Sequence, residues 1–156
     1  MNDLFWRILV FDFLAAFVVA KLEIEVEGKY GWAAHLPTAK IDSKFIQLIF
    51  TSGTKPFTNY HLWLFLTVLV FLHLPFFVDP SFWSVPIELF LLGNYMLAMG
   101  IEDFLWFVFN PKFGIGKLNK EHAPWHRWIG PIPILYFRIV ILFIVFLGLS
   151  WYIQTK

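Results

Sequence analysis

Long apolar stretches separated by polar connections dominate the pattern of this 156-residue chain. Four stretches approach the roughly 20 apolar residues that a helix needs to cross about 30 Å of hydrocarbon. They cover residues 4–20, 61–78, 82–109 and 132–153. We therefore predict an all-α membrane protein, a bundle of four transmembrane helices in which residues 1–156 form a single polytopic domain.

The first apolar stretch has a second interpretation, a secretory signal peptide. Such a peptide begins with basic residues and continues with an uncharged apolar run. This chain instead begins Met-Asn-Asp, and Asp12 interrupts the apolar run. The pattern therefore favours a true membrane helix over residues 4–20.

Composition supports a membrane location and excludes several kinds of chemistry. Charged residues make up only 15% of the chain, whereas soluble domains average about 25%. The 20 Phe and 8 Trp residues present more aromatic surface than the interior of a small soluble protein can bury. Membrane lipids are therefore expected partners, and a net charge of +1 argues against nucleic acid. The absence of cysteine excludes disulfides and thiolate metal ligands.

Basic residues concentrate in the two long connections between the apolar stretches. Lys21, Lys29, Lys40, Lys44 and Lys55 lie in the first connection, and Lys112, Lys117, Lys120 and Arg127 lie in the last. The opposite side would carry only Arg7 and Lys156. Because positive loops stay on the cytoplasmic side, we expect both long connections in the cytoplasm and both termini outside.

The extramembrane loop 21–60 shows two short patterns of its own. Apolar and acidic residues alternate from Leu22 to Glu27, which predicts a strand. Gly28 could turn this strand into a β-hairpin with residues 30–36. Its glutamates would face solvent, or else attract a cation or a basic partner. Residues 44–50, which follow the potential capping residues Asp42 and Ser43, predict a short interfacial helix.

Ionisable residues inside the apolar stretches are costly and often mark function. Glu102, Asp103 and Arg138 should lie at one depth on consecutive antiparallel helices, so an ion pair or a catalytic group is expected there. Asp12, His73 and Glu88 lie deeper or nearer the far side. These three residues could instead form a proton relay.

Histidines gather near the same cytoplasmic end. His122 and His126 are four residues apart, although Pro124 argues against a continuous helix between them. His61 begins the second apolar stretch, and Glu102 lies just below. We expect His61, His122, His126 and Glu102 to hold a metal ion, with iron, zinc or manganese suited to these ligands. The alternative is that these side chains only contact water or lipid headgroups.

These patterns lead to three functional hypotheses. The first is a metal-dependent enzyme that acts on a lipid or apolar substrate at the cytoplasmic interface, with Glu102, Asp103 and Arg138 as catalytic residues. The second is a non-catalytic membrane subunit or scaffold, and the third is a small proton-linked transporter. A homo-oligomer or a partner membrane subunit is compatible with each of them.

Overall fold

The computed structural model describes residues 2–46 and 55–156 and is mostly helical. Four long or medium helices form the body of the molecule: α1 (Asn2–Glu27), α3 (Asn59–Leu72), α5 (Val85–Phe109) and α6 (Ile134–Gln154). Shorter elements connect them, namely α4 (Leu74–Val78) and the 3-10 helices η1 (Pro80–Phe82) and η2 (Ile115–Lys117). The expectation of an all-α architecture is confirmed.

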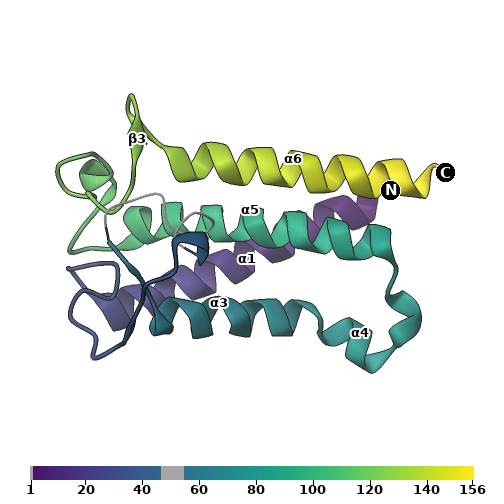
Figure 1. Ribbon diagram of the computed structural model, residues 1–156, viewed down its shortest axis with the longest axis horizontal. Helices are drawn as coiled ribbons and strands as arrows, with labels where there is room; N and C mark the ends of the chain where they lie inside the picture. The colour runs from purple at the N-terminus through teal and green to yellow at the C-terminus, as the bar shows by residue number, and fades with distance from the viewer. Residues whose placement is uncertain (1, 47–54) are drawn as a thin grey trace.

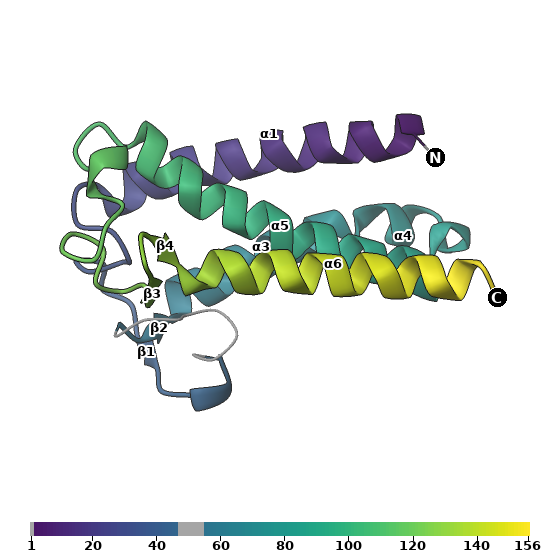
Figure 2. The same ribbon diagram turned by 90° about the horizontal axis from the view of Figure 1, so that it is seen from above.

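The four principal helices run along the long axis of the molecule (Figure 1). Both termini lie at one end, and residues 28–46, 55–58 and 110–133 lie at the opposite end, which we call the loop end. Figure 2 shows that α5 lies obliquely, with its N-terminal end near the C-terminal end of α6 and its C-terminal end near the C-terminal end of α1. Alternating helix directions therefore place the C-terminal ends of α1 and α5 beside the N-terminal ends of α3 and α6.

Small residues allow α5 and α6 to approach closely. A Cβ atom at Gly100 would lie 2.9 Å from Ile139 Cδ1, and one at Gly93 would lie 3.1 Å from Phe146 Cβ. The Ser150 hydroxyl also donates a 2.7 Å hydrogen bond to the Pro86 carbonyl. Helix pairs in membranes commonly use such small residues and interhelical hydrogen bonds, because lipid removes the hydrophobic force between helices.

The strand expected from Leu22 is wrong, because α1 continues as a helix to Glu27. Burial along this segment follows the helical period, with Ala20, Glu23, Ile24 and Glu27 inside and Leu22 and Glu25 outside. Gly28 then ends the helix in the left-handed region at φ 62°. The expected hairpin over residues 30–36 is absent from this described segment, which forms turns and bends.

Two small hairpins close the loop end instead. In one, β1 (Lys40–Ile41) pairs antiparallel with β2 (Phe57–Thr58), and in the other β3 (Trp128–Ile129) pairs with β4 (Ile132–Pro133). The Asn110 side chain, which is almost fully buried, donates to the Gly28 carbonyl at 2.8 Å. This bond fixes the C-terminal ends of α1 and α5 to each other.

The structure supports two membrane-spanning helices by length and composition, where the sequence predicted four. Among the described residues, α5 and α6 are long and apolar enough to cross a membrane. The segment predicted at 61–78 is divided at His73 into α3 and α4, since Pro75 in the first turn of α4 has no amide proton to continue the hydrogen bonding of α3. The charges of Arg7, Asp12 and Lys21 lower the apolar character of α1.

The interfacial helix expected at residues 44–50 falls mainly outside the described residues. Lys44–Ile46 are helical, and the structure describes nothing from 47 to 54.

Candidate metal centre

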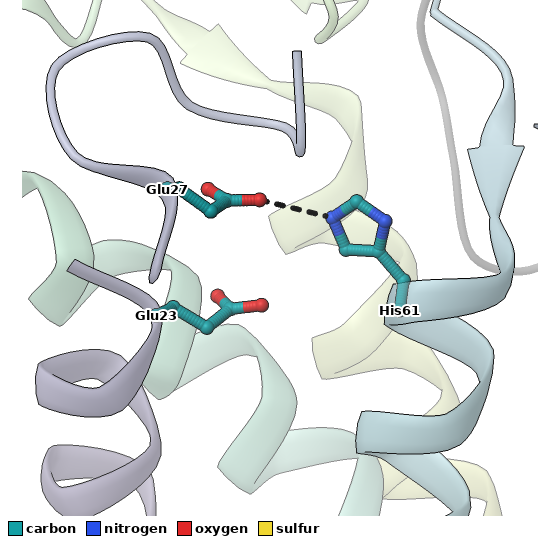
Figure 3. A group of neighbouring side chains, drawn as sticks. All are labelled: Glu23, Glu27 and His61. Atoms are coloured by element: carbon teal, nitrogen blue, oxygen red, sulfur yellow. Dashed lines mark ion pairs between the residues drawn. The ribbon is translucent and has the colours of Figure 1, made fainter. Parts of the chain in front are cut away.

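Three potential metal ligands converge near the loop end of the bundle. Glu23 and Glu27 lie one turn apart on α1, and His61 faces them from the first turn of α3 (Figure 3). One ligand atom from each residue lies within 4.8 Å of the other two, and all three side chains are buried. The i, i+4 spacing explains why both glutamates present carboxylates on the same helix face.

The Glu27 carboxylate also holds the chain that follows α1. Its two oxygens accept hydrogen bonds from the backbone amides of Trp32, at 2.9 Å, and Ala33, at 2.5 Å. Both residues have left-handed φ angles, 51° and 49°, which are costly for side chains other than glycine. Glu27 thus stabilises a strained turn while its Oε1 atom lies 3.4 Å from His61 Nε2.

The His61 ring has a fixed orientation. Its Nδ1 atom lies 2.7 Å from the Thr58 hydroxyl, and the ring stacks on Trp32 with 4.3 Å between ring centroids. These contacts leave Nε2 pointing at the glutamates (Figure 3). When Nδ1 donates its proton to Thr58, Nε2 carries the lone pair that a metal ion requires.

Helix α5 brings two more carboxylates, Glu102 and Asp103, to the same region. The carboxyl groups of Glu23 and Glu102 are close enough to interact. Glu23 Oε1 and Glu102 Oε1 are nevertheless buried without a hydrogen-bond partner among the described residues. Buried carboxylates are normally paired, protonated or bound to a metal ion, so these two oxygens are compatible with a proton shared by the two carboxyl groups and with a bound cation.

Asp103 connects α5 to α6 and to the last connection. The Tyr136 hydroxyl of α6 donates to Asp103 Oδ2 at 2.7 Å. His126, only 4% exposed, places Nε2 3.4 Å from Asp103 Oδ1 without hydrogen-bond geometry. The two oxygens of Asp103 therefore face a phenol on one side and an imidazole on the other.

A cavity of about 70 Å³ lies among these groups. Its polar wall consists of Glu23, Glu27, His61, Glu102 and Asp103, and its apolar wall includes Phe65, Met96, Met99 and Leu135. One water needs roughly 10–15 Å³ by this measure, so an ion and a few small ligands fit. The lining of the cavity therefore combines carboxylate and imidazole ligands with apolar side chains.

A lysine near this cavity does not neutralise it directly. The Lys55 ammonium lies over the Trp125 ring, 4.3 Å from its centroid. Burial lowers the pKa of this ammonium, and the nearby charge of Glu27 acts in the opposite direction. The ionisable groups that lie 3.4 Å from Glu27 and from Asp103 are histidines, which carry a positive charge only when protonated.

The structure brings together most of the residues that the sequence singled out. His61, Glu102 and Asp103 line one cavity, and His126 adjoins Asp103. His122 is exposed and bonds Asn119 Oδ1 through Nδ1, because the chain turns sharply around Pro124. Arg138 lies half-buried on α6 near Tyr136, and its expected ion pair with Glu102 or Asp103 stays a prediction.

Sequence reasoning missed the central role of Glu23 and Glu27. The alternation from Leu22 to Glu27 concealed a helical signal, in which Ala16, Ala20 and Ile24 recur every four residues and continue the face of α1. Glu23 and Glu27 fall on this face. Extending the first helix by that spacing would have placed both carboxylates inside the bundle.

The other ionisable groups that the sequence predicted inside membrane helices lie away from the cavity. His73 Nε2 is 3.0 Å from Glu88 Oε1, and Trp83 Nε1 donates to the other oxygen of Glu88. Asp12 is buried in α1, and its Oδ2 atom has no hydrogen-bond partner within the described part of the chain. The His73–Glu88 pair lies near the start of α5, at the opposite end of that helix from Asp103.

Comparison with known proteins gives no family for this chain. No protein-family model, curated protein or solved structure matches it. The functional argument therefore depends on the geometry described above.

Proposed function

We propose that this protein is an integral membrane enzyme with a metal ion bound by Glu23, Glu27 and His61. The observation that carries the proposal is the convergence of these three buried side chains, within 4.8 Å, on an internal cavity. Glu102 supplies a further carboxylate from α5. The metal would act as a Lewis acid or activate a water molecule in the cavity.

The ligand types restrict the metal to a few candidates. Carboxylates and imidazole without thiolate suit iron, manganese or zinc. Carboxylate-rich sites inside four-helix bundles typically hold iron or manganese, and three of the nearby groups here are glutamates. Iron and manganese are therefore the metals that we expect to copurify with the natural protein.

Membrane insertion of the whole bundle is part of this proposal. The helices α5 and α6 have the required length and apolar character. Large apolar side chains of α6 lie on the surface, such as Ile141, 59% exposed, and Ile144, 60% exposed. Water-exposed apolar surface of this extent is rare in soluble proteins. In the proposed arrangement α1 and the α3–α4 pair complete four spans, and the lysine-rich loop end faces the cytoplasm.

An apolar groove beside the metal cavity supports a lipid or other apolar substrate. This groove of about 400 Å³ lies between α1, α5 and α6 and is lined by residues such as Phe13, Leu97 and Phe104. Ile139 lines both the groove and the cavity, and Tyr136 of the groove bonds Asp103 of the cavity. An apolar chain in the groove would thus lie next to the carboxylates.

Elemental analysis of the detergent-purified full chain tests the metal site. We expect at least one iron, manganese or zinc ion per chain, lost in Glu23→Gln and His61→Ala. The matched controls are Glu25→Gln, on the exposed face of α1, and His122→Ala, which should both retain the metal. A wild-type protein that neither contains metal nor is stabilised by added Fe(II), Mn(II) or Zn(II) would overturn the proposal.

A second experiment separates a catalytic site from a purely structural one. After loading with Co(II), an open coordination position should bind azide and change the visible spectrum, because catalytic metal sites keep a position for substrate or water. An unchanged spectrum at saturating azide would indicate a closed, structural metal site.

The apolar substrate is tested with a long-chain alcohol that carries a photoreactive diazirine. We expect its cross-links at Leu97 and Phe104 in the groove to exceed those at Ile141 and Ile144 on the outer face of α6. Equal labelling of both surfaces would show only surrounding lipid and would contradict a substrate groove.

A further inference from the structure

The polar groups around Asp103 form a second cluster beside the ligands already assigned. Glu102 and His126 are 3% and 4% exposed, and Asp103 lies between the His126 ring and the Tyr136 hydroxyl. The first cluster is Glu23, Glu27 and His61, whose ligand atoms converge without Glu102, Asp103 or His126. A metal held only by the first cluster therefore leaves this second cluster unexplained.

The second cluster contains buried atoms that lack partners. Glu102 Oε1 and His126 Nε2 have no hydrogen-bond partner among the described residues. His126 Nε2 is directed at Asp103 Oδ1, 3.4 Å away, in a position where one ion could contact both atoms. Leaving a buried polar atom without a partner costs stability, and a cation between these atoms would remove that cost.

Glu23 and Glu102 link the two clusters. Their carboxyl groups are close enough to interact, and each has an oxygen without a hydrogen-bond partner. A carboxylate has two oxygens and can contact two ions at once. In two-metal sites the ions lie roughly 3.5–4 Å apart, which is a span that bridging carboxylates cover.

Charge balance also favours more than one divalent ion. Four carboxylates meet here, those of Glu23, Glu27, Glu102 and Asp103, and only Asp103 has a partly exposed side chain. Like charges at such short distances oppose joint ionisation. If metal binding displaces the protons and all four carboxyl groups are ionised, one divalent ion offsets two of the four negative charges, whereas two ions offset all four.

We propose that the site is dinuclear, with a second divalent transition metal bound by Glu102, Asp103 and His126 and with Glu23 shared between the two ions. This inference rests on the proposed metal site of Glu23, Glu27 and His61. The Tyr136 hydroxyl holds the second oxygen of Asp103 and fixes the orientation of that ligand. With two ions, the site could stabilise both the attacking and the leaving oxygen of a reaction, which a single ion does less well.

The test is a titration of the metal-free full chain in detergent with Mn(II) alone. Bound manganese is counted per chain, and its paramagnetic resonance spectrum is recorded. The wild-type chain should bind two Mn(II) ions with a spectrum of an exchange-coupled pair. Asp103→Asn, which keeps the size of the side chain, and His126→Ala should each bind one ion with an uncoupled spectrum. His122→Ala should still bind two.

The number of ions distinguishes this inference from the function on which it rests. A wild-type chain that binds one Mn(II), lost in Glu23→Gln and unaffected by Asp103→Asn, overturns the second ion and leaves the first site standing. Two ions that persist in both Asp103→Asn and His126→Ala also overturn the inference. A chain that binds no Mn(II) overturns both proposals.

Discussion

At the scale of single residues, the candidate site depends on how neighbouring groups position His61. Thr58 has two roles, because its hydroxyl meets His61 Nδ1 at 2.7 Å and also caps the first turn of α3 by accepting from the His61 amide. Groups that orient a ligating histidine contribute to metal affinity, although they do not touch the metal. Thr58 is therefore a positioning residue for the proposed metal.

Replacing Thr58 with valine removes this hydroxyl and keeps the shape of the side chain. We expect Thr58→Val to weaken metal binding about 10–100-fold, since the histidine loses its partner. The loss of the cap should also lower the free energy of unfolding by about 1 kcal/mol. Metal titration and thermal melting measure the two effects. Thr58→Ser keeps the hydroxyl and should restore both, whereas equal metal affinity in all three proteins would contradict the positioning role.

The sequence predicted part of this site at residue level. His61, Glu102, Asp103 and His126 were recognisable because ionisable groups near a predicted membrane end are unusual. Glu23 and Glu27 were not, since their alternation with Leu22 and Val26 is typical of a strand. His122 and His126 are four residues apart, and nothing in the sequence was a reason to separate them. The fold shows that His122 is exposed and His126 is buried.

At the scale of helices and strands, length and apolar character predicted the approximate positions of the helices. The observed helix ends differ from the predicted ones because local chemistry decides them. Pro75 divides the second stretch, and Ser84 caps α5, which begins at Val85 and not at residue 82. The helical structure of residues 22–27 could not be predicted from their own alternating pattern. Burial of Ala20 and Ile24 against α5 and its neighbours favours the helical period over the alternating one.

The close contact between α5 and α6 gives a prediction about helix packing. A methyl group at Gly100 would lie 2.9 Å from Ile139 Cδ1 and 3.1 Å from its Cγ2. Ile139 is β-branched and has one strongly preferred rotamer in a helix, so it cannot easily turn away. Gly100→Ala should therefore lower the free energy of unfolding by about 1 kcal/mol or more.

Gly148→Ala is the matched control on α6, where an added Cβ would meet nothing within 4 Å. It should leave stability unchanged or raise it by up to about 1 kcal/mol, because alanine favours a helix more than glycine. Unfolding titrations in detergent compare the two variants. Equal changes in the free energy of unfolding for Gly100→Ala and Gly148→Ala would contradict the close packing of α5 against α6.

At the scale of the whole molecule, the alternation of helix directions places all the proposed metal ligands at one end. Glu23 and Glu27 end α1, His61 begins α3, and Glu102 and Asp103 lie near the end of α5 (Figures 1 and 3). Ligands far apart in the chain meet because both long connections lie at that end. The proposed function therefore requires both connections on one side of the membrane.

Single-cysteine labelling checks this arrangement, and the natural absence of cysteine makes the background clean. Cysteines at Lys40 and Gly116 should react with an impermeant reagent from one side of the membrane. Cysteines at Ser81 and Lys156 should react from the other side. Labelling of Lys40→Cys and Gly116→Cys from opposite sides would contradict the bundle in the membrane.

The most direct test of the central claim is to locate the metal itself. Anomalous diffraction from crystals of the zinc-loaded full chain, recorded at the zinc absorption edge, shows where the ion binds. The account predicts a strong peak about 2.0–2.2 Å from His61 Nε2 and from carboxylate oxygens of Glu23 and Glu27. A map with no peak among these three residues, or with its strongest peak at the exposed His122, would contradict it.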